Sequence, residues 1–278
     1  MLMQNLPPVF ASRQRSSQSY NSDFHLHESY ELYLLIDGEI DYFVERACYR
    51  LRPGSLLLFD DKTIHKSSNF SNMPFERVSV HFDPWLAHDL STGKTDLLRC
   101  FAGGEDKILQ LTDGEMEQFL SAADRIVRLG SERLLGTDVL QNACLMELLV
   151  FVGRCFDAHK SSPPPVRVRA SRLRPFLEYI ETHLSDDLSL DCLAKGLSVS
   201  KSTISHVFKE ETGSTPSRYI TARRIALAKR LLLDGASVTE ACMQCGFNDY
   251  ANFIRVFKAI TSVSPGQYRK TARRSPEG

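Results

Sequence analysis

The C-terminal part of the chain contains two copies of one pattern, and this repeat restricts the folds that the region can adopt. The first copy, LAKGLSVSKSTISHVFKEETGSTPSRY, begins at Leu193, and the second, ACMQCGFNDYANFIRVFKAITSVSPGQY, begins at Ala241. At an offset of 49 residues the following pairs coincide: Ile204 with Phe253, Val207 with Val256, Phe208 with Phe257, Lys209 with Lys258, Thr212 with Thr261, Pro216 with Pro265 and Tyr219 with Tyr268. A repeat of this specificity indicates one supersecondary unit that is used twice.

Each copy is typical of two short helices joined by a tight turn. The first helix has a small inward-facing residue, the turn contains a glycine, and the second helix begins with a side chain that can cap its N-terminus. In chain order these residues are Ala194, Gly196 and Ser200 in the first copy, and Cys242, Gly246 and Asn248 or Asp249 in the second. Such a pair is a helix-turn-helix, whose second helix presents its outer face to the major groove of DNA.

The predicted DNA-contacting residues lie on the outer face of each second helix. They are Lys201, Ser202, Ser205, His206 and Lys209 in the first copy, and Tyr250, Ala251, Ile254, Arg255 and Lys258 in the second. Arg255 can bind O6 and N7 of guanine, whereas Ala251 and Ile254 can contact a thymine methyl group. The alternative is a plain helical bundle with solvated polar faces, but the repeat, the turn spacing and the charge together favour DNA binding.

The charge of the chain is unevenly distributed, although its formal net charge is zero. The region from Ser171 to Gly278 has 16 Lys and Arg against 11 Asp and Glu, and the remainder has 18 against 23. A basic back half indicates a polyanionic partner. The back half also contains a C-x-x-C pair, Cys242 and Cys245, which we interpret as two buried helix residues rather than a zinc or redox site.

The front half has the pattern of a β-rich domain followed by helices. Residues 20–83 are rich in Tyr, Leu, Ile, Phe and Val, with turn signals at Asp37-Gly38 and Pro53-Gly54, which predicts a sandwich or a small barrel. Two helices are expected to start at Asp113 and at Thr137 or Asp138. The second helix is apolar on more than one face, so that either the β-domain or a partner subunit must cover it.

Polar residues at the start of the β-region form a candidate site. His25, His27 and Glu31 share the parity of a strand and can point to one side, and His65 follows downstream. Three imidazoles and a carboxylate can bind zinc, iron, nickel or manganese, can hydrogen-bond an organic ligand, or can satisfy one another inside the barrel. His81 is interpreted as a core histidine.

The back half resembles the DNA-binding domain of the AraC/XylS family of bacterial transcription regulators. The similarity covers the whole region, including RRIALAKRLL between the two copies and the closing SPGQYR. It implies two helix-turn-helix units joined by a long helix, Pro216 to Leu233, with both recognition helices in successive segments of the major groove. Ser262 and Cys242 depart from the glycine and alanine that the family usually has, and Ser262 is expected to strain a helix end that requires positive φ.

The front half resembles a cupin. The spacing H-x-H-x3-E-x6-G from His25 to Gly38 matches the first cupin motif, in which these His and Glu residues are metal ligands. The second motif is partial: Gly54, His65 and Asn69 fit it, but Asp60 and Lys62 replace the usual proline and glycine. The resemblance implies a cupin barrel that acts as the sensor, with a divalent metal as a possible cofactor.

These patterns predict an α+β multidomain protein with an N-terminal cupin-like β-barrel and an all-α C-terminal domain. The expected division is an effector-binding domain at 1–112, a helical extension at 113–157 that can form a dimer, a Pro-rich linker at 158–170 and the double helix-turn-helix domain at 171–278. The extended, proline-containing AHKSSPPPVRVRA marks the linker.

The predicted function is a ligand-responsive, sequence-specific transcription regulator, which is not an enzyme. Its expected partners are double-stranded DNA, a small-molecule effector, a second copy of the chain and RNA polymerase, as the family implies. No membrane partner is expected, because Met1 to Tyr20 lacks an apolar leader and the run from Ala143 to Val152 is short, so we expect a cytoplasmic protein. The rival hypotheses are a cupin oxygenase or isomerase with a DNA-binding tail, and a front half that acts mainly as a dimerisation module.

Overall fold

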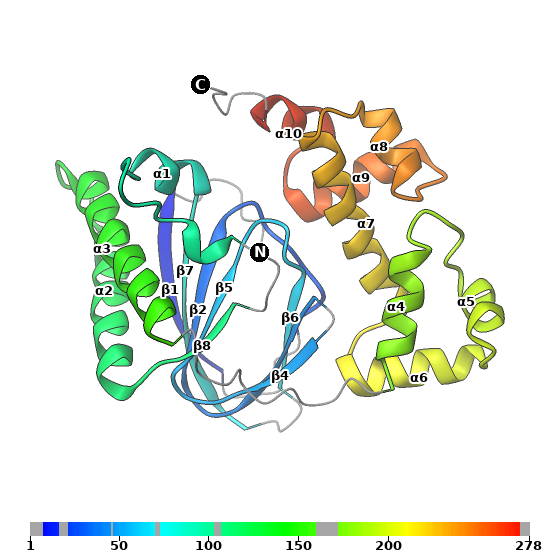
Figure 1. Cartoon of the computed structure of the whole chain (residues 1–278), viewed down its shortest axis with the longest axis horizontal. Coiled ribbons are helices and arrows are strands. Elements are labelled where there is room, and N and C mark those ends of the chain that lie inside the picture. Colours follow the sequence, from blue (N-terminus) through cyan, green and yellow to red (C-terminus); the bar gives the residue numbers. More distant parts are fainter. Residues whose placement is uncertain are drawn as a thin grey trace.

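A computed structural model of the chain describes residues 8–16, 22–45, 47–69, 73–102, 107–159 and 172–272. Figure 1 shows a β-barrel with two long helices, α2 and α3, along one side and a helical unit, α4 to α10, along the other side. The predicted α+β architecture, with a β-rich front half and an all-helical back half, is therefore confirmed. Most of the predicted Pro-rich linker, from residue 160 onward, lies outside the described residues.

Strands of the barrel form two antiparallel sheets. In the described residues of the front half these strands are β1 (Val9–Ser16), β2 (Tyr30–Asp37), β3 (Ile40–Val44), β4 (Ala47–Leu51), β5 (Ser55–Phe59), β6 (His65–Ser68), β7 (Phe75–Phe82) and β8 (Ile108–Gln110). One sheet has the order β1-β7-β2-β5-β8, and the other has the order β4-β3-β6. Gly38, at φ +83°, lies in the turn that leads from the first sheet into the second. A glycine is required there, because a Cβ would lie 2.6 Å from the carbonyl oxygen of Pro74.

Both faces of strand β2 are covered, which explains its continuous run of apolar residues. Leu32 and Leu34 belong to the cluster that the barrel shares with α2 and α3. Tyr33 and Leu35 belong to a second cluster, which lies between the two sheets. Because side chains alternate along a strand, Glu31 points to the same side as Tyr33, into the barrel.

The helices that flank the barrel are short α1 (Pro84–Asp89), the 3-10 turn η1 (Arg99–Phe101), α2 (Asp113–Ser131) and α3 (Thr137–Ala158). Helix α2 starts where the sequence predicts, because Thr112 and Glu115 form a reciprocal capping box. Helix α3 is longer than the apolar run inside it. By length and composition alone it could cross a membrane, but the core helices of soluble proteins have the same length and composition. Its stripe from Cys144 to Cys155 is buried against the barrel layer.

The back half contains α4 (Arg174–Thr182), α5 (Leu190–Leu197), α6 (Lys201–Thr212), α7 (Pro216–Leu233), α8 (Val238–Gln244), α9 (Tyr250–Thr261) and α10 (Pro265–Ala272). Helices α5 and α6 form the first helix-turn-helix, and α8 and α9 form the second, with α7 between them. Ser200 and Asp249 cap the two recognition helices by accepting hydrogen bonds from the backbone N–H of Thr203 and Asn252. The bounds of α7 are those that the sequence predicts.

The turn of the first helix-turn-helix differs from the prediction. Gly196 lies inside α5, where a Cβ would be 2.1 Å from Oη of Tyr179, so this glycine is required for close packing and not for the turn. The residue with positive φ is Ser198, which aligns with Gly246 of the second copy at the upstream offset of 48. Serine and glycine thus occupy equivalent left-handed positions in the two copies. The two turns have the same backbone conformation although their residue types differ.

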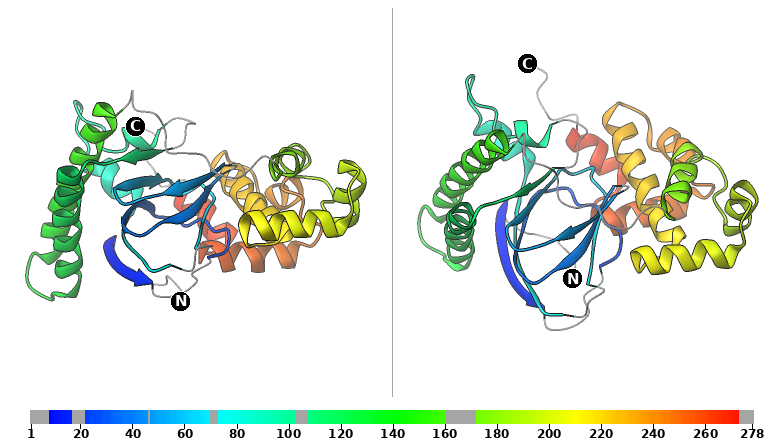
Figure 2. Two further views of the ribbon diagram at one scale, coloured as in Figure 1. Left: turned by 90° about the horizontal axis from the view of Figure 1, so that it is seen from below. Right: turned by 60° about the horizontal axis from the view of Figure 1, so that its bottom comes forward.

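The helical unit packs directly against the barrel, which the sequence did not predict. Phe24 and Phe43 of the barrel belong to one apolar cluster with the core of the helical unit. The ring of Phe24 lies 5.1 Å from that of Tyr219 on α7 in an edge-to-face arrangement. The two views in Figure 2 show the same close apposition of barrel and helices.

Candidate functional site

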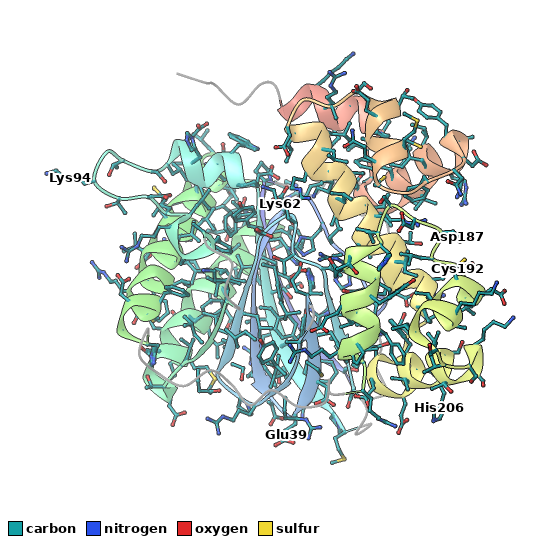
Figure 3. All side chains as sticks on the ribbon, turned by 45° about the vertical axis from the view of Figure 1, so that its right-hand side comes forward. Glu39, Lys62, Lys94, Asp187, Cys192 and His206 are labelled. Atoms are coloured by element: carbon teal, nitrogen blue, oxygen red, sulfur yellow. The ribbon has the colours of Figure 1, made fainter. Side chains whose placement is uncertain are left out.

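The outer face of helix α6 contains the predicted DNA-contacting residues of the first copy. Ile204, Val207 and Phe208 on the opposite face are buried, so the helix position is determined by its core side. Lys201, Ser202, His206 and Lys209 are exposed and Ser205 is half-buried. Figure 3 shows His206 on the outer surface of the helical unit.

The basic side chains of α6 have acidic neighbours in the free protein. Nζ of Lys201 lies 2.8 Å from Asp191, and Nε2 of His206 lies 3.3 Å from Glu210. Both pairs are exposed, and exposed ion pairs contribute little free energy. The cations can therefore exchange these neighbours for phosphate oxygens or base edges at small cost.

The outer face of α9 contains the corresponding residues of the second copy. Tyr250, Ala251, Arg255 and Lys258 are exposed, whereas Ile254 is half-buried and packs on the hydrophobic core. Oδ1 of Asn252 accepts a hydrogen bond of 2.6 Å from the guanidinium of Arg255. This contact orients the arginine fork before any DNA is bound.

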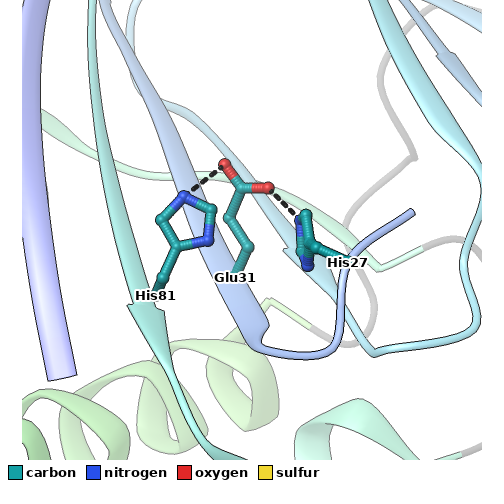
Figure 4. A group of neighbouring side chains, drawn as sticks. All are labelled: His27, Glu31 and His81. Carbon is teal, nitrogen blue, oxygen red and sulfur yellow. Dashed lines mark hydrogen bonds and ion pairs between the residues drawn. The ribbon is translucent and has the colours of Figure 1, made fainter. Parts of the chain in front are cut away.

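A buried polar cluster lies inside one end of the barrel, and Glu31 is at its centre. Nε2 of His27 lies 2.8 Å from Oε2 of Glu31, and Nε2 of His65 lies 3.5 Å from the same oxygen. Nε2 of His81 lies 3.5 Å from Oε1. Figure 4 shows the carboxylate of Glu31 between the rings of His27 and His81.

Backbone oxygens determine how three of the imidazoles are oriented. Nδ1 of His27 donates to the carbonyl oxygen of Ser29 at 2.6 Å, and Nδ1 of His65 donates to that of Thr63 at 2.9 Å. Nδ1 of His25 donates in the same way to Asp23 at 2.8 Å. Because a carbonyl oxygen can only accept, each Nδ1 carries a proton, and these three contacts fix the orientation of the rings.

Burial shifts the pKa values of the cluster. Burial raises the pKa of Glu31, but the charge of His81 and the hydrogen bonds of His27 and His65 outweigh it, so that this pKa lies well below its ordinary value. Desolvation is the main cause that lowers the pKa of His25 to about 3 and that of His81 to about 4. Burial thus disfavours the protonated form of His25 and His81, whereas their neighbours hold Glu31 in its ionised form.

The structure brings all four predicted residues of this site together, but by a route other than the expected one. His25 and His27 do not share a strand with Glu31; they precede β2, and His25 pairs with His65 as an isolated β-bridge. His81 also belongs to the cluster, because it is the cross-strand partner of Glu31. Its parity within FERVSVHF could have shown that it points into the barrel, but only the strand register shows that it meets Glu31.

The C-x-x-C pair lies in the core of the second helix-turn-helix. Cys242 and Cys245 are both buried. The thiol of Cys245 donates to the carbonyl oxygen of Cys242 at 3.4 Å, and burial raises its pKa to about 12. These contacts are those of packed helix residues, as the sequence predicts.

Comparisons with known proteins divide the chain in the same order as the fold. Residues 6–149 match the family model of the AraC-like ligand binding domain, and residues 193–271 match that of a helix-turn-helix domain. The chain is 24% identical over 258 residues to the HTH-type transcriptional activator RhaS of Escherichia coli O81 (strain ED1a), which covers 88% of this chain and 87% of the relative. It is 36% identical over 102 residues to RhaS of Escherichia coli O139:H28 (strain E24377A / ETEC), covering 36% of this chain and 37% of the relative.

Among solved structures, similar chains include ToxT from Vibrio cholerae O395 bound to (E)-4-(8-methylnaphthalen-1-yl)but-3-enoic acid. That similarity has 12% identity and a TM-score of 0.42, and covers 96% of this chain and 100% of that chain. The C-terminal domain of AraT, a response regulator from Geobacillus stearothermophilus, is 33% identical over 36% of this chain and 85% of its own, with a TM-score of 0.35.

A barrel with a buried polar cluster, joined to two helix-turn-helix units, defines a class of DNA-binding regulator that senses a ligand. The ligand-binding model covers more than half of the chain. This chain belongs to the AraC family of transcription regulators. It is accordingly a ligand-binding, DNA-binding transcription regulator and not an enzyme, which excludes the cupin oxygenase or isomerase.

Proposed function

We propose that the barrel cluster is the effector site and that it signals to DNA through helix α7. The effector would contact His25, His27, Glu31 and His65 within the barrel. The ten residues on the outer faces of α6 and α9 would bind double-stranded DNA. The domain division at 1–112, 113–157, 158–170 and 171–278 is part of this proposal.

The contact between Lys229 and the barrel is the observation that supports this mechanism most directly. Lys229, on α7, is fully buried, and its Nζ donates to the carbonyl oxygens of His27, at 3.4 Å, and of Asp61. Nε2 of the same His27 contacts Glu31. A ligand that moves His27 therefore also moves an acceptor that holds the helix between the two DNA readers.

Two ion pairs tie α7 to the same side of the barrel. Arg218 pairs with Asp23 at 2.5 Å, two residues before His25. Arg223 pairs with Glu45 of the barrel and, at 2.5 Å, with Glu181 of α4. A ligand changes DNA affinity only to the extent that it distinguishes two arrangements of these contacts.

The helical extension is the proposed dimer surface. Four apolar side chains are exposed around the turn between α2 and α3, at one end of this pair of helices: Leu134, Leu135, Val139 and Leu140. Exposed apolar patches often mark protein–protein contacts. A homodimer in the cytoplasm is the proposed assembly. We propose that it activates transcription by contacting RNA polymerase, because the similar RhaS proteins are transcriptional activators.

The experiment that tests DNA binding is a salt titration of the full-length protein. Selection from a random DNA pool first defines its site, and fluorescence anisotropy then measures affinity at several salt concentrations. The logarithm of affinity should fall with the logarithm of salt concentration, with a slope near −0.9 for each phosphate contact. A flat profile would contradict the assigned faces, and sedimentation at several concentrations would separately test the dimer.

A further inference from the structure

The guanidinium of Arg224, near the middle of α7, contacts the segment that leads into the first helix-turn-helix. Its Nε donates to the carbonyl oxygen of Leu184 at 3.1 Å, and its Nη2 donates to that of Asp186 at 2.6 Å. Both acceptors lie between α4 and α5. Two donors in one rigid plane fix both the position and the orientation of this segment, which a single hydrogen bond cannot do.

The same segment continues into α5 through local hydrogen bonds. The carboxylate of Asp187 accepts from the backbone N–H of Ser189 at 2.8 Å and from the thiol of Cys192 at 3.2 Å (Figure 3). The hydroxyl of Ser189 in turn caps α5 by accepting from the backbone N–H of Cys192. Because α6 packs on α5, the position of the first recognition helix depends on the segment that Arg224 holds.

The guanidinium also contacts the turn of the second helix-turn-helix. Its Cζ lies 5.9 Å from the ring centroid of Phe247, within the range of a cation–π contact. The ring of Phe247 lies 5.3 Å from that of Phe253, which is fully buried on α9. Arg224 therefore reaches the core side of the second recognition helix through one aromatic ring.

Gly246 brings the two helix-turn-helix units into direct contact at the same place. It has φ +80°, and a Cβ there would lie 2.6 Å from the carbonyl oxygen of Leu184 and 2.9 Å from Nη2 of Arg224. Figure 1 shows the loop between α4 and α5 beside the loop between α8 and α9, next to α7. The turn of the second unit thus lies against both the segment before the first unit and the guanidinium.

Neighbouring arginines of α7 have different partners. Arg218 pairs with Asp23, and Arg223 pairs with Glu45, so that both tie α7 to the barrel. Arg224 contacts the two helix-turn-helix units instead. Its contacts therefore concern how the units lie relative to each other, and not how they lie on the barrel.

We propose that Arg224 is a positioning residue that fixes α9 relative to α6 and thereby selects the spacing between the two halves of the operator. This inference rests on the proposed DNA-binding faces of α6 and α9. A site with two halves gains affinity over one half only when both helices can bind at once. One additional base pair moves a half-site by about 3.4 Å and rotates it by about 35°, which a fixed pair of helices cannot follow.

The test uses full-length protein and three duplexes derived from its selected site. They are the site itself, the site with one base pair inserted between its halves, and the site with one half scrambled. Fluorescence anisotropy measures each affinity, and the wild type should bind the inserted duplex at least about 10-fold more weakly than the selected one.

Arg224→Lys should lose most of this discrimination. It keeps the positive charge, but a lysine cannot present the two-donor plane that holds both carbonyl oxygens. Its affinity for the duplex with one intact half should equal that of the wild type, because each unit keeps its own recognition face. Arg230→Lys, at an exposed arginine of the same helix, is the matched control and should discriminate as the wild type does.

Gly246→Ala tests the same contact from the other side. Its Cβ would displace the carbonyl oxygen of Leu184, so the discrimination should fall here too. Gly235→Ala is its control, because Gly235 has φ +98° but no described atom within 4 Å of a Cβ. The control has the strain of positive φ without the clash, so it should lower the melting temperature and leave the spacing preference unchanged.

An Arg224→Lys variant that discriminates between the spacings as strongly as the wild type would overturn this inference and leave the proposed DNA-binding faces intact. An equal loss of affinity for the complete site and for one half would overturn it as well, because Arg224 would then act within one unit. Wild-type protein that binds one half as tightly as the complete site would contradict the proposed pair of faces, and this inference with it. If circular dichroism shows that Arg224→Lys does not fold, the two glycine variants decide the question.

Discussion

Nζ of Lys229 lies 3.4 Å from the carbonyl oxygen of His27, although 202 residues separate them in the chain. The same ammonium group donates to the carbonyl oxygen of Asp61 and lies 3.5 Å from its carboxylate. A lysine that is buried this completely needs such partners, because desolvation of an unpaired cation is costly. The relationship joins the helix between the DNA readers to the segment that contains the barrel site.

Replacing Lys229 by methionine should loosen this junction. Lys229→Met keeps the length of the side chain but removes the donor to two carbonyl oxygens, so we expect the free energy of unfolding to fall by about 1–3 kcal/mol. Chemical denaturation followed by circular dichroism measures the change. Lys94→Met, at an exposed lysine of a barrel loop, is the matched control (Figure 3). A variant as stable as the wild type would show that the desolvation of the ammonium cancels its contacts.

Arg255 is the strongest base reader that we propose. Arg255→Ala should weaken binding to the specific site by about 1–3 kcal/mol and relax the preference at one base pair. Anisotropy titrations with the selected site and with single-base variants measure both effects. Arg128→Ala, at an exposed arginine of α2 in the front half, should leave the affinity unchanged. Equal affinities of Arg255→Ala and wild type would remove Arg255 from the DNA interface.

Ser262 is a site where the chain can be stabilised. It has φ 65° at the C-terminal end of α9, and Gly213 has φ 66° at the equivalent end of α6. Ser262→Gly should raise the free energy of unfolding by about 0.5–1 kcal/mol, because glycine adopts this conformation without a Cβ clash and loses part of the gain through a more flexible unfolded chain. Ser262→Ala keeps the Cβ and should show no such gain; a gain equal to that of glycine would assign the effect to the lost hydroxyl instead.

Thiol reactivity tests the role of the C-x-x-C pair. Cys192 is half-exposed, whereas Cys242 and Cys245 are buried and burial raises the pKa of both. A thiol reagent should therefore modify Cys192 rapidly in the native protein and reach the pair only on unfolding. Mass spectrometry of digested, labelled protein locates the modified residues. Fast labelling of Cys242 or Cys245 in the folded protein would contradict their assignment to the core.

The helical half was predictable because its signals are local. Pro216 after a capping Thr215 starts α7, and Ser200 and Asp249 start the recognition helices by hydrogen bonds within one turn. Residue type misled us where two residues can adopt one backbone conformation, as in the turn that contains Ser198 rather than Gly196. The fold requires positive φ at this position, and serine adopts it at a cost in conformational energy. Nothing in the sequence indicates that a serine has this conformation.

The barrel was less predictable because its contacts are distant in sequence. Strand β1 is polar along much of its length and, among the strands that the structure describes, it pairs with β7 alone, so a local pattern does not reveal it. The contribution of His81 to the site depends on its register opposite Glu31. The packing of α7 on the barrel depends on Lys229, Arg223 and Arg218, whose charges are typical of a solvated helix face.

Helix α7 connects the two helix-turn-helix units, and it also contacts the barrel. Its 18 residues span about 27 Å, so a tilt of about 5° would move one end by about 2 Å, close to the length of a hydrogen bond. Since α6 and α9 flank this helix, such a tilt moves both recognition helices relative to the barrel at once. The length of α7 sets the distance between the two helices, so α7 should select the spacing of the two halves of the operator as well as their bases.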